Sequence, residues 1–163
     1  MLYLGIPNDK GGHRMNTIYF DMDGTLADLY AVDNWLDALR AYDPMPYTCA
    51  APMQDLRQLA RLLNRLQVNG YKIGIISWLS KESTCEYDEA VRAAKKRWLA
   101  QHLPSVVWDE IHLVKYGAPK HFACKDNSGI LFDDNEHIRK LWEKYGIAYD
   151  VDNIIEILKS FLE

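Results

Sequence analysis

The chain has 163 residues, which is enough for one domain with a hydrophobic core and leaves little room for a second. Its net charge of -4 argues against a long anionic partner such as nucleic acid, which is usually bound by a basic face. Every apolar run is much shorter than the roughly 20 residues of a membrane span, so we expect no membrane partner. The three cysteines form no CxxC pair, and free thiols fit a reducing cytoplasm.

Residues 1–14 show no helical or strand period and contain Pro7 and three glycines. Lys10-Gly11-Gly12 can be encoded by a bacterial ribosome-binding sequence, and Met15 follows after a short spacer. We therefore expect 1–14 to be an N-terminal extension upstream of a native start at Met15, with an ordinary flexible tail as the alternative. The folded domain is expected to cover 15–163.

From Thr17 onward, short apolar runs typical of buried strands alternate with segments of helical period. We expect strands at 17–20, 72–77, 110–116, 129–134 and 147–151. We expect helices at 29–41, 53–67, about 83–102, 119–125, 135–145 and 153–162. Such alternation predicts an α/β fold, in which a three-layer, doubly wound parallel sheet carries helices on both faces.

Local signals refine three of the expected helices. Pro44 and Pro46 should end the helical pattern that begins at Leu29. Ser83 and Glu86 have the spacing of a capping box at the start of the long helix. The charged run RAAKKRW (92–98) near the end of that helix should form a solvated face, where cations also suit the helix dipole.

Polar side chains close three of the expected strands. Asp21 follows the first strand, Ser77 ends the second, and Asp133 and Asp134 end the fourth. Ligands of parallel sheets bind outside the carboxyl ends of the strands, so these groups should meet at one edge. Together with Asp23, the carboxylates would repel one another unless a cation offset their charge. Mg²⁺ prefers oxygen ligands and leaves room for phosphate, so the four aspartates are the expected metal ligands.

The same residues can support phosphoryl transfer. The carboxylate of Asp21 can attack phosphorus and form an aspartyl-phosphate. Asp23 can protonate the leaving oxygen and later deprotonate the hydrolytic water. Gly24 permits a sharp turn whose amides are free for an anion, and the hydroxyls of Thr25 and Ser77 are further candidates for phosphate binding.

A fixed cation should also face the phosphoryl group. Both Lys115 and Lys120 lie upstream of the last two aspartates and could supply it. The residue pattern alone leaves the choice between them open.

Asp21-Met22-Asp23-Gly24-Thr25-Leu26 resembles the first motif of the haloacid dehalogenase-like (HAD) phosphohydrolases. Ser77 after KIGII resembles their second motif, and Asp133-Asp134 after GILF resembles the fourth. The third motif of the family is a lysine, for which the resemblance favours Lys120, because Pro119-Lys120 opens an expected helix. It also implies a Rossmann-like core with a small helical cap at about 28–55.

Dehalogenases of this superfamily lack the second aspartate, so Asp23 indicates phosphoryl transfer. The leading expectation is a Mg²⁺-dependent phosphomonoesterase that acts on a small phosphate ester. The short cap segment, and ISWLSK followed by a long helix, resemble the 5'(3')-deoxyribonucleotidase branch, which implies a (deoxy)nucleoside monophosphate as the substrate. Trp78, next to Ser77, is then a candidate for the phosphate site and for stacking on a base. A sugar-phosphate or nucleic-acid 3'-end phosphatase and a catalytically silent phosphate-binding protein are the alternatives. The sequence carries no signal for the oligomeric state.

Overall fold

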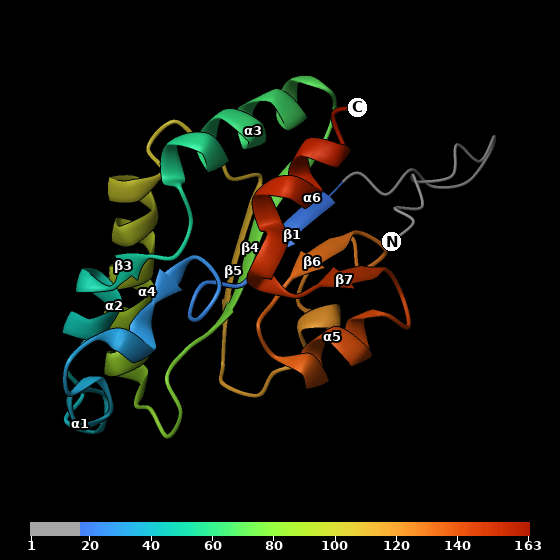
Figure 1. The fold of residues 1–163 in the computed structure, drawn as a ribbon. Coiled ribbons are helices and arrows are strands. Elements are labelled where there is room, and N and C mark those ends of the chain that lie inside the picture. Colours follow the sequence, from blue (N-terminus) through green and yellow to red (C-terminus); the bar gives the residue numbers. More distant parts are fainter. Residues whose placement is uncertain (1–16) are drawn as a thin grey trace.

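The computed structural model describes residues 17–163, so the expected N-terminal extension and the start at Met15 lie outside the described residues. A five-stranded parallel sheet forms the centre, with the strand order β5-β4-β1-β6-β7 (Figure 1). The strands are β1 (Thr17–Phe20), β4 (Lys72–Trp78), β5 (Glu110–Val114), β6 (Ile130–Phe132) and β7 (Ile147–Tyr149). The predicted parallel α/β sheet is confirmed.

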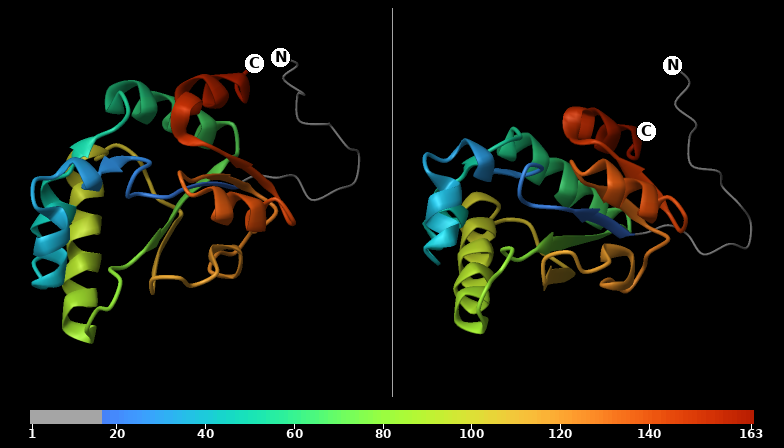
Figure 2. Two further views of the ribbon diagram at one scale, coloured as in Figure 1. Left: turned by 60° about the horizontal axis from the view of Figure 1, so that its bottom comes forward. Right: turned by 90° about the horizontal axis from the view of Figure 1, so that it is seen from below.

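Helices cover both faces of this sheet (Figures 1 and 2). Strand residues alternate between the two faces, so Ile18 and Phe20 pack on one side and Tyr19 on the other. The first side is covered by α3 (Leu56–Val68) and α6 (Ile154–Ser160), and the second by α5 (Glu136–Trp142). The result is the expected three-layer, doubly wound arrangement.

A short insertion follows β1. Strands β2 (Ala27–Asp28) and β3 (Ala51–Pro52) pair antiparallel and bracket it, in the region where a cap at about 28–55 was expected. Between them lie the 3₁₀ turn η1 (Leu29–Ala31) and the helices α1 (Trp35–Arg40) and α2 (Met45–Cys49). We call residues 29–50 the cap.

One expectation for the cap is wrong and a second is confirmed. The single helix at 29–41 is interrupted, because Asn34 adopts a left-handed conformation (φ 57°) between η1 and α1. The helical pattern that begins at Leu29 does end before Pro44, since α1 stops at Arg40. Pro46 lies in the first turn of the next helix, α2, where its missing N–H costs no helical hydrogen bond.

The long helix α4 (Cys85–His102) packs against α2, so the cap lies along one side of α4. Its N-cap is Thr84, whose side chain accepts a hydrogen bond from the backbone N–H of Tyr87. The expected capping box of Ser83 and Glu86 is therefore wrong by one residue. The expected helix at 119–125 is a single 3₁₀ turn, η2 (Lys120–Phe122). Within 17–163, no helix is both long and apolar enough to cross a bilayer.

Candidate active site

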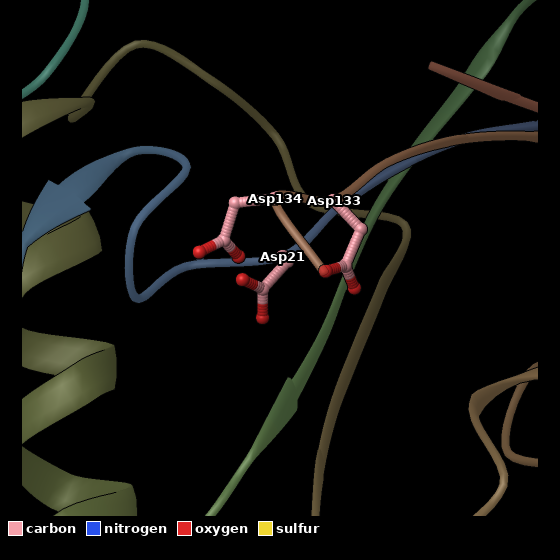
Figure 3. A group of neighbouring side chains, drawn as sticks. All are labelled: Asp21, Asp133 and Asp134. Carbon is pink, nitrogen blue, oxygen red and sulfur yellow. The ribbon is translucent and has the colours of Figure 1, made fainter. Parts of the chain in front are cut away.

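Three carboxylates meet at the carboxyl ends of β1 and β6. The parallel register pairs Phe20 with Phe132, so the residues that follow, Asp21 and Asp133, lie side by side. Asp134 completes the group, and ligand oxygens of the three side chains lie within 4.8 Å of one another (Figure 3). Asp21 and Asp133 are buried, while Asp134 is the most exposed of the three and its carboxyl group is only partly withdrawn from solvent.

The three carboxylates repel one another, so a nearby cation would stabilise their ionised forms. Burial and the neighbouring charge of Asp21 raise the pKa of Asp133 to about 6 and the pKa of Asp134 to about 7. The donor atoms are all carboxylate oxygens, which are the ligands that a hard divalent cation such as Mg²⁺ prefers. Asp21, Asp133 and Asp134 therefore fit the predicted magnesium site.

Lys120 supplies a second source of positive charge. After the extended Pro119, the η2 turn directs its side chain into the site, where Nζ lies 2.8 Å from Asp21 Oδ1 and 2.7 Å from Asp133 Oδ2. Burial alone would lower the pKa of Lys120, but the two carboxylates outweigh it and raise the pKa above its usual range. Lys115 is exposed, so the structure brings only Lys120 to the carboxylates.

Asp23 lies apart from this cluster. Its Oδ2 accepts a hydrogen bond of 2.7 Å from Lys95 Nζ, and its carboxylate is not among the three that converge. Burial raises the pKa of Asp23, although Lys95 opposes the shift. Of the four aspartates expected as metal ligands, the structure thus brings three together and gives the fourth a lysine partner.

Lys95 is the site residue that the sequence interpretation missed. The run 92–98 was expected to be solvated, and this is wrong for Lys95, which is 1% exposed. The helical period carries the signal, since Val91, Lys95 and Trp98 follow one another on the buried face of α4. Lys96 and Arg97 are exposed, as expected.

The residues after Asp21 form a tight turn. Gly24 has a positive φ of 81°, and a Cβ at this position would lie 2.3 Å from Asp134 Oδ2. The Gly24 N–H donates to the carbonyl of Ala27, and the Thr25 N–H donates to that of Met22. These amides were expected to be free for an anion, and they are not.

The two hydroxyls expected to bind phosphate are both fully buried. Thr25 Oγ1 donates to Asp21 Oδ2 at 3.2 Å and so orients the carboxylate. Ser77 Oγ accepts from Lys95 Nζ at 2.7 Å. Phosphate binding by Gly24, Thr25 and Ser77 stays a prediction.

A cavity of about 520 Å³ joins the site to the cap. Its lining includes Asp21, Asp23 and Lys120. Six aromatic side chains share the same lining: Tyr30, Trp35, Tyr42, Tyr47, Trp78 and Tyr116. Trp78 is held by a 2.8 Å hydrogen bond from its Nε1 to the Ala118 carbonyl, and its ring centroid lies 5.5 Å from Lys120 Nζ. The cavity thus has an ionic part and an aromatic part.

No family model and no curated protein sequence matches the chain. Solved structures do. D,D-heptose 1,7-bisphosphate phosphatase from Burkholderia thailandensis matches with a TM-score of 0.58 and 12% identity, over 91% of this chain and 99% of that one. The fold is the haloacid dehalogenase-like fold. D,D-heptose 1,7-bisphosphate phosphatase from B. bronchiseptica, complexed with magnesium and phosphate, matches with a TM-score of 0.49 and 15% identity, over 82% and 78% of the two chains. At these identities the similarity concerns the fold alone.

Proposed function

We propose that the protein is a Mg²⁺-dependent phosphomonoesterase that hydrolyses a (deoxy)nucleoside monophosphate through an aspartyl-phosphate on Asp21. The observation that carries the proposal is the shared cavity: Asp21, Asp23 and Lys120 line the same hollow as the six aromatic side chains. Its volume falls in the range of about 300–1,000 Å³ that is typical of small-molecule sites.

Asp21 is suited to act as the nucleophile because both of its oxygens are held. Oδ1 is bound by Lys120 and Oδ2 by Thr25, so the carboxylate presents a defined face to a phosphoryl group in the cavity. Lys120 also stabilises negative charge that develops on that group. Mg²⁺ bound by Asp21, Asp133 and Asp134 would add further positive charge beside the phosphate.

Asp23 is suited to acid–base work. It lies two residues from the nucleophile and lines the same cavity. Burial raises its pKa, which favours the protonated form that a general acid needs. After protonating the leaving oxygen, the resulting carboxylate can accept the proton of the water that hydrolyses the aspartyl-phosphate.

The aromatic part of the cavity supports a planar leaving group. Tyr and Trp side chains stack on nucleobases with little regard to base identity. Trp78 and Tyr116 lie with ring centroids 4.9 Å apart on the core side of the cavity, while Tyr30 and Trp35 lie 5.1 Å apart in the cap. All four rings line the same cavity as Asp21, so a base stacked on one of them would share the cavity with a 5'-phosphate at Asp21.

A sugar bisphosphate is the second candidate. Arg40 and Lys81 also line the cavity and could bind a second phosphate. The two candidate substrates would use different parts of the cavity. A nucleotide would contact the aromatic rings, whereas a sugar bisphosphate would contact Arg40 and Lys81.

A panel of phosphate esters assayed with and without Mg²⁺ tests the proposal. It should contain 5'- and 3'-deoxynucleotides, heptose bisphosphate, simple sugar phosphates and a 3'-phosphorylated oligonucleotide, with Asp21→Asn as the inactive control. We expect the highest kcat/KM with a nucleoside monophosphate and no turnover without Mg²⁺. A preference for heptose bisphosphate would select the second candidate, and phosphate binding without turnover would select a silent binding protein.

A further inference from the structure

We propose that Lys95 is a positioning residue for Asp23, which sets the direction of the carboxylate that transfers the proton. The inference rests on the phosphomonoesterase function proposed above. It concerns a residue of α4, which the HAD-like motifs in the sequence do not include.

The three contacts of Lys95 are the first argument. Nζ lies 2.7 Å from each of Asp23 Oδ2, Ser77 Oγ and the carbonyl oxygen of Trp78. An ammonium group has three protons, so each contact can use one of them and the group has a single favourable orientation. Lys95 thereby connects the loop after β1, which carries Asp23, to the end of β4 at Trp78. Both Asp23 and Trp78 line the cavity.

The burial of Lys95 is the second argument. A buried ammonium is costly unless charges and hydrogen bonds compensate it, and Lys95 is 1% exposed. The next residue, Lys96, is exposed on the same helix. The formation of α4 therefore does not explain why the ammonium group of Lys95 is buried. On the cap side, Nζ lies 5.1 Å from the ring centroid of Tyr47, which lines the cavity and covers the ammonium.

The contacts suit the task of a general acid and base. Lys95 binds Oδ2 of Asp23, which leaves Oδ1 for the proton that passes to the leaving oxygen. Because lysine has only donors, Ser77 Oγ must act as the acceptor toward it, and the Ser77 proton points elsewhere. Loss of Lys95 should therefore misdirect Asp23 without removing the nucleophile, the carboxylate cluster or Lys120.

The test compares Lys95→Met, which keeps the length of the side chain, with Lys96→Met as the matched control. The rate of product release in the first turnover and the steady-state KM are measured with two substrates. The leaving group of p-nitrophenyl phosphate needs little protonation, whereas the leaving alcohol of the best nucleotide substrate needs a proton. A misplacement of about 1 Å can cost on the order of 10²-fold in rate. We expect a loss of this order for the nucleotide, a loss of less than about tenfold for p-nitrophenyl phosphate, and little change in KM.

Three outcomes would overturn the inference: Lys95→Met behaves like Lys96→Met, or both substrates lose the same factor, or only KM changes. If Lys95→Met does not fold, Lys95→Gln replaces it: its shorter, uncharged amide offers two donors to three acceptors, so a smaller loss with the same substrate dependence is expected. A wild-type protein that hydrolyses neither ester would refute the proposed function instead. A crystal structure of the variant then decides the positioning role by itself: Asp23 should leave its place, and an unmoved carboxylate contradicts the inference.

Discussion

Lys120 Nζ lies 2.8 Å from Asp21 Oδ1, although the two residues are 99 positions apart in the chain. This contact distinguishes Lys120 from Lys115, which is exposed five residues earlier. Lys120→Ala should lower kcat by about 10²–10³-fold, the scale for losing one preorganised charge-stabilising contact. Lys115→Ala should have little effect. Steady-state kinetics of both variants with one good substrate tests the assignment, and a crippled Lys115→Ala would move the catalytic lysine upstream.

Asp23→Asn should keep the fold but lose the proton transfer. Turnover should fall by about 10²–10⁴-fold, the usual contribution of a positioned acid or base. Asp21→Asn should lose more, because it removes the nucleophile and one of the clustered carboxylates. Beryllofluoride should form its adduct on Asp21 of the wild-type protein, as seen in a crystal structure. Wild-type turnover by Asp23→Asn, or an adduct on another residue, would contradict the assigned roles.

Gly24→Ala should damage the carboxylate cluster, because its Cβ would lie 2.3 Å from Asp134 Oδ2. Gly70→Ala is the matched control: Gly70 also has a positive φ, of 93°, but nothing lies within 4 Å of its Cβ position. Each variant should lose about 1 kcal/mol of stability from the left-handed backbone. Only Gly24→Ala should also lose Mg²⁺ affinity, measured by calorimetry. Equal affinities in the two variants would show that Asp134 is not needed for the metal.

Stabilisation by Mg²⁺ should depend on pH. The pKa values of about 6 for Asp133 and about 7 for Asp134 exceed the usual value near 3.9 for an unfolded aspartate. The folded carboxyls therefore hold protons more tightly, and the metal-free protein loses stability as the pH rises from about 4 through 7. Mg²⁺ requires the ionised carboxylates, so it should raise Tm more at pH 8 than at pH 5.

Thermal unfolding with and without Mg²⁺ at both pH values measures this difference. Asp134→Asn is the control, since it removes one titrating group. The difference between its Mg²⁺-induced shifts in Tm at pH 5 and pH 8 should be smaller. The same Mg²⁺-induced shift in Tm at pH 5 and pH 8 would be evidence against carboxylate ligation of the metal at this cluster.

Much of the fold follows from local features of the sequence. Alternating apolar runs and helical periods predicted all five strands of the central sheet, because burial on both faces makes a parallel strand continuously apolar. Asn34 and Pro46 show the limit of such features. Asparagine is compatible with both helical and left-handed backbone, and proline can either end a helix or lie in its first turn. The packing of the cap on α4 selects the observed conformation at each residue.

The sequence by itself determined that Asp21, Asp133 and Asp134 would meet, because parallel strands end at the same edge of a sheet. Only the tertiary structure decided which lysines join them. Lys95 and Asp23 are 72 residues apart. The helical period places Lys95 on the buried face of α4, but no local pattern states that this face docks beside the loop after β1. The choice of Lys120 likewise depends on the η2 turn that carries its side chain back to the strand ends. Charged side chains that are so far apart in the chain come into contact only when the elements that carry them pack together.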